Sequence, residues 1–201
     1  MFSKIPSVEQ VLAMPKELLP KILCPDGECG FHNVAHMTAV ASNALNLSRY
    51  YGLPTRNTYL AFLAGLFHDA GRKDILDKLN IETALTIASK YAPISPVDWP
   101  IFSKYLSATE FSEEKTQELA SSGTLGELIV RDSDFLVWAN KTKQEDMFRG
   151  LSEETGTKVD LQSTTQFLQD HGVFLPRSQR LLRKAGIPGV PQIASALLAP
   201  V

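Results

Sequence analysis

The sequence has few cysteines, no long apolar run and almost no net charge. Two cysteines in 201 residues are too few for a disulfide framework, so we expect reduced thiols and a cytoplasmic location. The longest apolar run, 59–67, is nine residues long, whereas a membrane-spanning helix needs about 20. The net charge of −2 gives no general attraction to a nucleic-acid polymer or to an anionic membrane. We therefore expect neither as a partner.

Helical signals dominate what is present, and no alternating strand pattern is found. Capping residues, glycines and prolines mark the helix boundaries, as in the capping box formed by Thr124 and Glu127. The main predicted helices are 31–51, 55–71, 82–91, 96–106, 112–123 and 124–141. The sequence thus predicts a single all-α domain over 1–201, with a core at about 31–141 and C-terminal helices in 151–199 packed on it.

Three of the four histidines lie within one short part of the chain. His32 and His36 are four residues apart on a predicted helix, so they are expected to share a face. His68 and Asp69 directly follow the apolar segment FLAGLF. Ionisable groups beside such a segment are costly unless partners satisfy them, and a divalent metal would do so. The alternative is that these residues have no ligand and form a hydrogen-bonded structural cluster in the core.

The segments FHNVAH, LFHDAG and VRDSDFL, between Phe31 and Trp138, resemble the HD superfamily of metal-dependent phosphohydrolases. The resemblance implies an HD-type helical bundle that cleaves a small phosphate ester, such as a nucleotide, with a metal-activated water. It also implies the metal ligands His36, His68, Asp69 and Asp134.

Asp132 competes with Asp134 for the last ligand position. Two residues along an α-helix correspond to a rotation of about 200°, so both side chains cannot face one ion. Helical periodicity does not decide between them. The last ligand of the family is typically an aspartate with a leucine two positions later, and Asp134 with Leu136 matches this pattern.

The ligand set also bears on the number and kind of metal ions. No histidine lies between Asp69 and Asp134, where two-metal members of the superfamily usually have two. We therefore expect one divalent ion, unless Asp74 and Asp77 complete a second site. Two imidazoles and two carboxylates leave room for water, which suits Mn, Co, Ni, Fe or Mg better than a closed tetrahedral zinc site, although zinc remains an option.

FHNVAH is also similar to the histidine segment of the cyclic-nucleotide phosphodiesterases, a likeness that implies a general-acid role for His32. Those enzymes have a further histidine where this chain has Arg72. Beside the ligand Asp69, Arg72 and Lys73 are expected to take part in catalysis by neutralising phosphate oxygens. The alternative for this basic pair is a solvated helix end.

Three other functions stay open at this point. The chain could be a cyclic-nucleotide-type phosphodiesterase, or an HD-fold protein that binds a ligand without turnover. A structural Cys₂His₂ zinc site could also form from Cys24, Cys29, His32 and His36, but it leaves His68 unexplained. The expected partner is a small phosphorylated substrate, and a homodimer is compatible with the sequence.

Overall fold

The computed structural model describes residues 18–24, 30–72 and 77–187, and it contains helices and no strands within these ranges. The all-α prediction is therefore confirmed. The α-helices are α2 (Leu18–Leu23), α3 (Val34–Tyr50), α4 (Thr55–Phe67), α5 (Asp77–Tyr91), α6 (Trp99–Ser107), α7 (Glu113–Ser122), α8 (Leu125–Phe135), α9 (Gln144–Thr155), α10 (Leu161–His171) and α11 (Pro176–Lys184). Two short 3₁₀ helices, Leu136–Ala139 and Lys141–Lys143, join α8 to α9.

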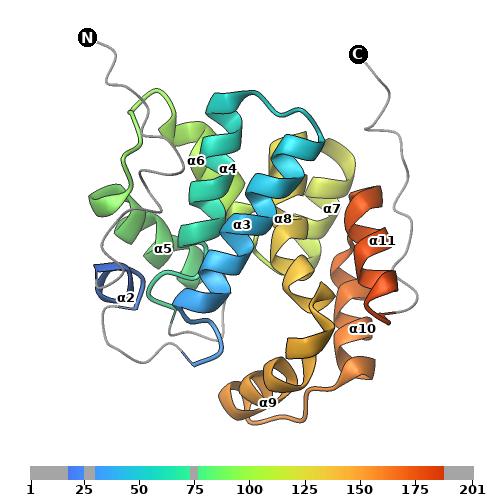
Figure 1. Cartoon of the computed structure of the whole chain (residues 1–201). Helices are drawn as coiled ribbons and strands as arrows, with labels where there is room; N and C mark the ends of the chain where they lie inside the picture. The colour runs from blue at the N-terminus through green and yellow to red at the C-terminus, as the bar shows by residue number, and fades with distance from the viewer. Residues whose placement is uncertain (1–17, 25–29, 73–76, 188–201) are drawn as a thin grey trace.

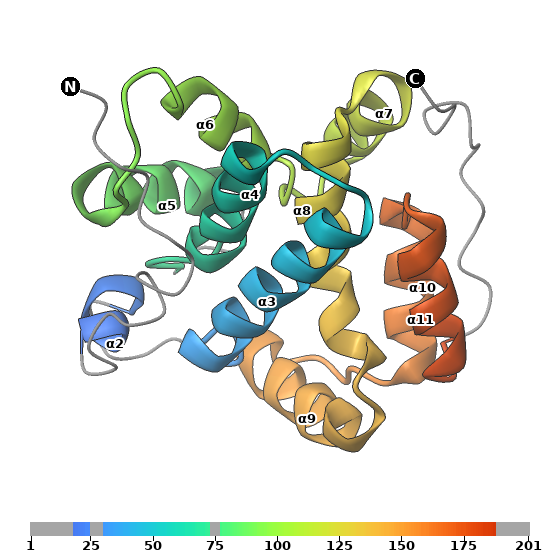
Figure 2. The ribbon, with the colours of Figure 1, turned by 45° about the horizontal axis from the view of Figure 1, so that its top comes forward.

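Helices α3, α4 and α8 pack against one another and form the centre of the molecule (Figure 1). Helices α2, α5 and α6 lie on one side of this centre, and α10 and α11 lie on the other (Figure 2). Helix α9 crosses below the ends of α3 and α8 in both views. In the part of the chain that is described, no helix is long and apolar enough to cross a membrane.

Helix α4 is buried on every side along its second half, as its composition predicts. All residues from Tyr59 to Phe67 are buried. A Cβ atom added to Gly65 would lie 3.1 Å from backbone atoms of Ala41, so glycine allows α3 and α4 to approach closely. This close approach brings the end of α4 to the start of α3.

Several predicted helix boundaries are wrong: the helix predicted over 55–71 ends at Phe67, the one predicted over 82–91 begins at Asp77, and two further differences bear on the site. Helix α3 begins at Val34, because the side chain of Asn33 caps it by accepting hydrogen bonds from the backbone N–H groups of Ala35 and His36. His32 therefore precedes the helix and does not share a helical face with His36. Helix α8 starts with the predicted capping box, but it ends at Phe135 rather than at residue 141 because the chain tightens into a 3₁₀ turn.

Arg131 and Asp132, both fully buried in α8, connect the central helices to the C-terminal ones. The Arg131 guanidinium donates to the carbonyl oxygens of Glu110 and His171, at 2.6 and 3.3 Å. The Asp132 carboxylate accepts from the backbone N–H groups of Phe174 and Leu175, at 3.0 and 2.7 Å. Through these bonds Arg131 and Asp132 of α8 contact the end of α10 and the segment before α11; residues 188–199 lie outside the described ranges.

Replacing Asp132 with alanine should destabilise the fold. The substitution leaves the buried N–H groups of Phe174 and Leu175 without an acceptor, at a cost of about 1–3 kcal/mol for each group. Urea unfolding at pH 8 measures the loss, with Asp146→Ala on the exposed face of α9 as the control. Equal stability of the two variants would contradict this role for Asp132.

Candidate metal centre

Four side chains from three separate segments meet at the junction of α3, α4 and α8. His36 lies in the first turn of α3, His68 and Asp69 directly follow α4, and Asp134 lies in the last turn of α8. All four residues are at least nine-tenths buried. The sequence therefore identified residues that do come together, although they are up to 98 positions apart along the chain.

The two imidazole nitrogens lie from each other, and from one oxygen of each carboxylate, at about the separations expected for ligands of one ion. His36 Nε2 is 3.1 Å from His68 Nε2, and 3.3 Å from both Asp69 Oδ2 and Asp134 Oδ1. His68 Nε2 is 2.8 Å from Asp69 Oδ2 and 3.7 Å from Asp134 Oδ1. Ligands about 2.1 Å from an ion are separated by about 3.0 Å at a right angle and about 3.4 Å in a tetrahedron. The residues present fit a divalent metal.

A backbone contact directs His68 toward the other ligands. Its Nδ1 lies 2.9 Å from the carbonyl oxygen of Gly65. A carbonyl oxygen only accepts, so Nδ1 carries the proton and the lone pair of the neutral ring is on Nε2, facing the cluster. Arg72 plays a related part, because its Nη1 donates to Asp69 Oδ1 at 3.1 Å and leaves Oδ2 to the imidazoles.

Burial and opposite charges act against each other in the cluster. Burial disfavours a charged His36, but hydrogen bonds and charge interactions with Asp134 and Asp69 outweigh it and raise the pKa of His36 to about 9. Burial likewise opposes ionisation of Asp69 and Asp134, yet the neighbouring imidazoles hold the pKa of both carboxyls below its ordinary value. The site thus favours two carboxylates together with a positive charge between them.

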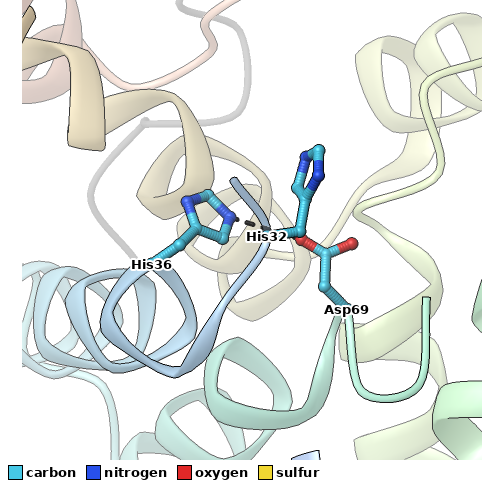
Figure 3. A group of neighbouring side chains, drawn as sticks. All are labelled: His32, His36 and Asp69. Carbon is cyan, nitrogen blue, oxygen red and sulfur yellow. Dashed lines mark ion pairs between the residues drawn. The ribbon is translucent and has the colours of Figure 1, made fainter. Parts of the chain in front are cut away.

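His32 lies beside His36 and Asp69 of this cluster (Figure 3). One ring nitrogen of His32 lies within 4.8 Å of donor atoms of His36 and Asp69, so these three residues form a second, overlapping group of metal-ligand type. Glu154 of α9 also contacts His32. Its Oε1 is 2.5 Å from His32 Nδ1, and its Oε2 accepts from the backbone N–H of Phe31 at 2.7 Å. Burial alone would raise the pKa of Glu154, but the hydrogen bond with His32 outweighs it, and the pKa lies below its ordinary value.

The structure places the remaining candidates as follows. Asp132 points away from the cluster to the backbone of Phe174 and Leu175, so Asp134 is the aspartate at the site. Burial raises the pKa of Asp132 to about 7, although those N–H groups favour its charged form. Lys73, Asp74 and the side chain of Asp77 lie outside the described residues.

The Cys₂His₂ alternative does not hold, because the sulfur of Cys24 is bonded in a disulfide and is not a free thiolate ligand. Cys29 lies outside the described ranges. The Nε2 atom of His36 lies 3.1 Å from that of His68 and so belongs to the cluster described above. The disulfide also differs from the reduced thiols expected above, since a chain with two cysteines gives no sign in its composition of whether they pair. The compartment itself stays a prediction.

A cavity of about 420 Å³ opens on the cluster and extends between α8, α9 and α10. This volume lies within the range of small-molecule binding sites. His32, His36, Asp69, Arg72, Asp134 and Glu154 contribute its polar wall. The site is therefore reachable by a small ligand.

Glu154 is the residue of this site that the sequence does not reveal. It lies 122 positions after His32, in a polar helix whose neighbouring Glu153 is of the same residue type. Nothing in the local pattern separates one glutamate from the other, and only the packing of α9 against the 30–33 segment does so. No family model, curated protein or solved structure matches the chain.

Metal affinity should depend on pH through His36. A metal ligand must be a neutral imidazole, so protonation competes with the ion. Because the pKa of His36 in the metal-free protein is about 9, affinity for Mn²⁺ should fall by about tenfold per pH unit below pH 9. Titration calorimetry in buffers of different ionisation enthalpy should detect about one proton released per ion at pH 7.

Asp134→Asn tests the origin of this proton, since it removes one of the charges that hold it on His36. The variant should bind Mn²⁺ more weakly and release fewer protons. Affinity that is constant between pH 6 and 8 would rule out the competition.

Proposed function

We propose that this protein is a metal-dependent phosphohydrolase of the HD type that cleaves a small phosphate ester. The observation that carries the proposal is the convergence of donor atoms from His36, His68, Asp69 and Asp134 at 2.8–3.7 Å. The order and spacing of these residues along the chain, which resemble the ligand pattern of that superfamily, support the same conclusion. A cytoplasmic location and a small phosphorylated partner belong to the proposal on sequence grounds alone.

The side chains around the cluster suit phosphate chemistry. When bound, a divalent cation supplies Lewis acidity, lowering the pKa of a coordinated water and polarising the phosphate. Arg72, held by Asp69, lies where its guanidinium can neutralise a non-bridging phosphate oxygen. His32 donates Nδ1–H to Glu154 and would deliver a proton from Nε2 to the departing oxygen.

The charges of the cavity favour a substrate with a single phosphate group. Among the described residues of its wall, three carboxylates face one guanidinium: Asp69, Asp134 and Glu154 against Arg72. A divalent cation brings these groups close to neutrality. One phosphate monoester then adds about 1.5–2 negative charges, whereas a polyphosphate would add several that no lining residue within the described ranges offsets.

Asp69→Ala should abolish both metal content and phosphatase activity, because it removes a metal ligand and the acceptor of Arg72. The purified protein would be assayed with a set of phosphate monoesters and diesters in Mn²⁺, Co²⁺, Ni²⁺, Mg²⁺ and Zn²⁺, beside elemental analysis. Asp146→Ala, on the surface of α9, is the matched control and should keep both properties. Full activity in Asp69→Ala would falsify the proposal, and metal binding without any turnover would favour the ligand-binding alternative.

His32→Ala should lower kcat by about 10²–10⁴-fold, the usual contribution of a general acid. The effect should be largest for alkyl esters, which need a proton on the departing oxygen, and smallest for 4-nitrophenyl phosphate. Metal content should be nearly unchanged. An equal loss for all esters, together with a loss of metal, would instead make His32 a ligand.

A further inference from the structure

Five aromatic side chains line the cavity beside its ionisable residues, and one of them, Phe31, contacts the rings of His32 and His36. Phe111, Phe135 and Phe167 form one side, from the segment after α6, from α8 and from α10. Phe31 and Trp138, which stack with an interplanar angle of 18°, also line the cavity. We call this part, lined by these five residues, the aromatic end of the cavity.

Phe167 is unusual among these rings because much of it remains exposed. It has 38% of its surface accessible, whereas Phe135 has 1% and Trp138 has 7%. Its ring makes edge contacts with Phe111 and Phe135, at centroid distances of 5.1 and 6.0 Å. These contacts hold the ring of Phe167 in place. A large apolar ring that is held in place and left open at a cavity is the kind of surface that a ligand covers.

A hydroxyl group without a partner lies at the same end. Thr164 is 3% exposed and belongs to the cavity wall, and its Oγ1 is buried without a hydrogen-bond partner. The other hydroxyl residues of the wall, Thr109, Thr155 and Ser163, each donate to a carbonyl oxygen. A buried hydroxyl without a partner is costly, and a polar ligand atom would satisfy it.

We propose that the aromatic end binds a planar aromatic group of the substrate, and that Thr164 hydrogen-bonds a polar atom on the edge of that group. The inference rests on the phosphohydrolase function proposed above, because the phosphate would then occupy the metal end of the same cavity. Aromatic rings favour stacked and edge-to-face partners over aliphatic chains of the same size. The aromatic group can be a nucleobase or another substituted aryl ring, since both present a flat face and a polar edge.

Phosphonates test this subsite without depending on turnover, because their phosphorus–carbon bond is not cleaved by a phosphatase. Titration calorimetry on the Mn²⁺-loaded protein should show phenylphosphonate binding about tenfold or more tightly than methylphosphonate. Phe167→Leu keeps an apolar side chain on α10, and it should remove most of this preference while leaving methylphosphonate binding unchanged. Tyr91→Ala, which removes an exposed ring on α5 outside the cavity, is the control and should keep the preference.

Thr164→Val tests the polar contact, since valine has the same shape and lacks the hydroxyl. The variant should bind phenylphosphonate as the wild type does. It should lose about three- to tenfold in affinity for ligands with a polar edge. Comparing a nucleoside phosphonate with hydroxyphenylphosphonate shows which kind of ring the subsite prefers.

Two results would overturn the proposal, and they differ in what else they affect. If methylphosphonate and phenylphosphonate bind equally, and Phe167→Leu changes neither, the aromatic subsite is wrong while the phosphohydrolase function stands. If Mn²⁺ binds and no phosphonate does, the proposed function and the subsite fail together.

Discussion

The site depends on an electrostatic constraint, the burial of two carboxylates whose oxygens lie 2.8–3.7 Å from the nitrogens of two imidazoles. Two buried carboxylates cannot both remain charged beside the same two rings unless a positive charge lies among them. In the metal-free protein a proton on His36 meets this need, and its raised pKa is the consequence. A divalent cation meets the same need with more charge. The fold must hold the four groups together against their desolvation.

The close packing of α3 on α4 supplies much of that support. Gly65 lets the two backbones approach, and the carbonyl oxygen of the same residue orients His68. Helix α8 completes the cluster through Asp134. Two residues earlier on the same helix, Asp132 binds the backbone of the segment before α11. Helix α8 therefore contributes Asp134 to the cluster and Asp132 to the contact with the C-terminal segment, so the position of Asp134 and the docking of that segment are linked.

The C-terminal helices also shape the cavity that the central helices leave open. Glu154 of α9 holds the segment before α3 through both His32 and the backbone of Phe31. Phe167 and Thr164 of α10 form part of the wall opposite. Both ends of the cavity therefore combine segments of the central part of the chain with a C-terminal helix. Glu154 of α9 contacts His32 beside the cluster, and Phe167 of α10 contacts Phe111 and Phe135.

The sequence by itself determined the helical class and most helix boundaries, because caps and apolar periodicity are local signals. The four residues of the cluster were predicted from the resemblance of their motifs to the HD superfamily, which favoured Asp134 where helical periodicity alone could not separate it from Asp132. The sequence also placed His32 on a helix, whereas Asn33 caps the start of that helix. Only the tertiary structure decided these points and revealed Glu154 and the aromatic end. They depend on which distant segments pack together, because the partners of a buried or half-buried charge, such as those of His36 and Glu154, come from elsewhere in the chain.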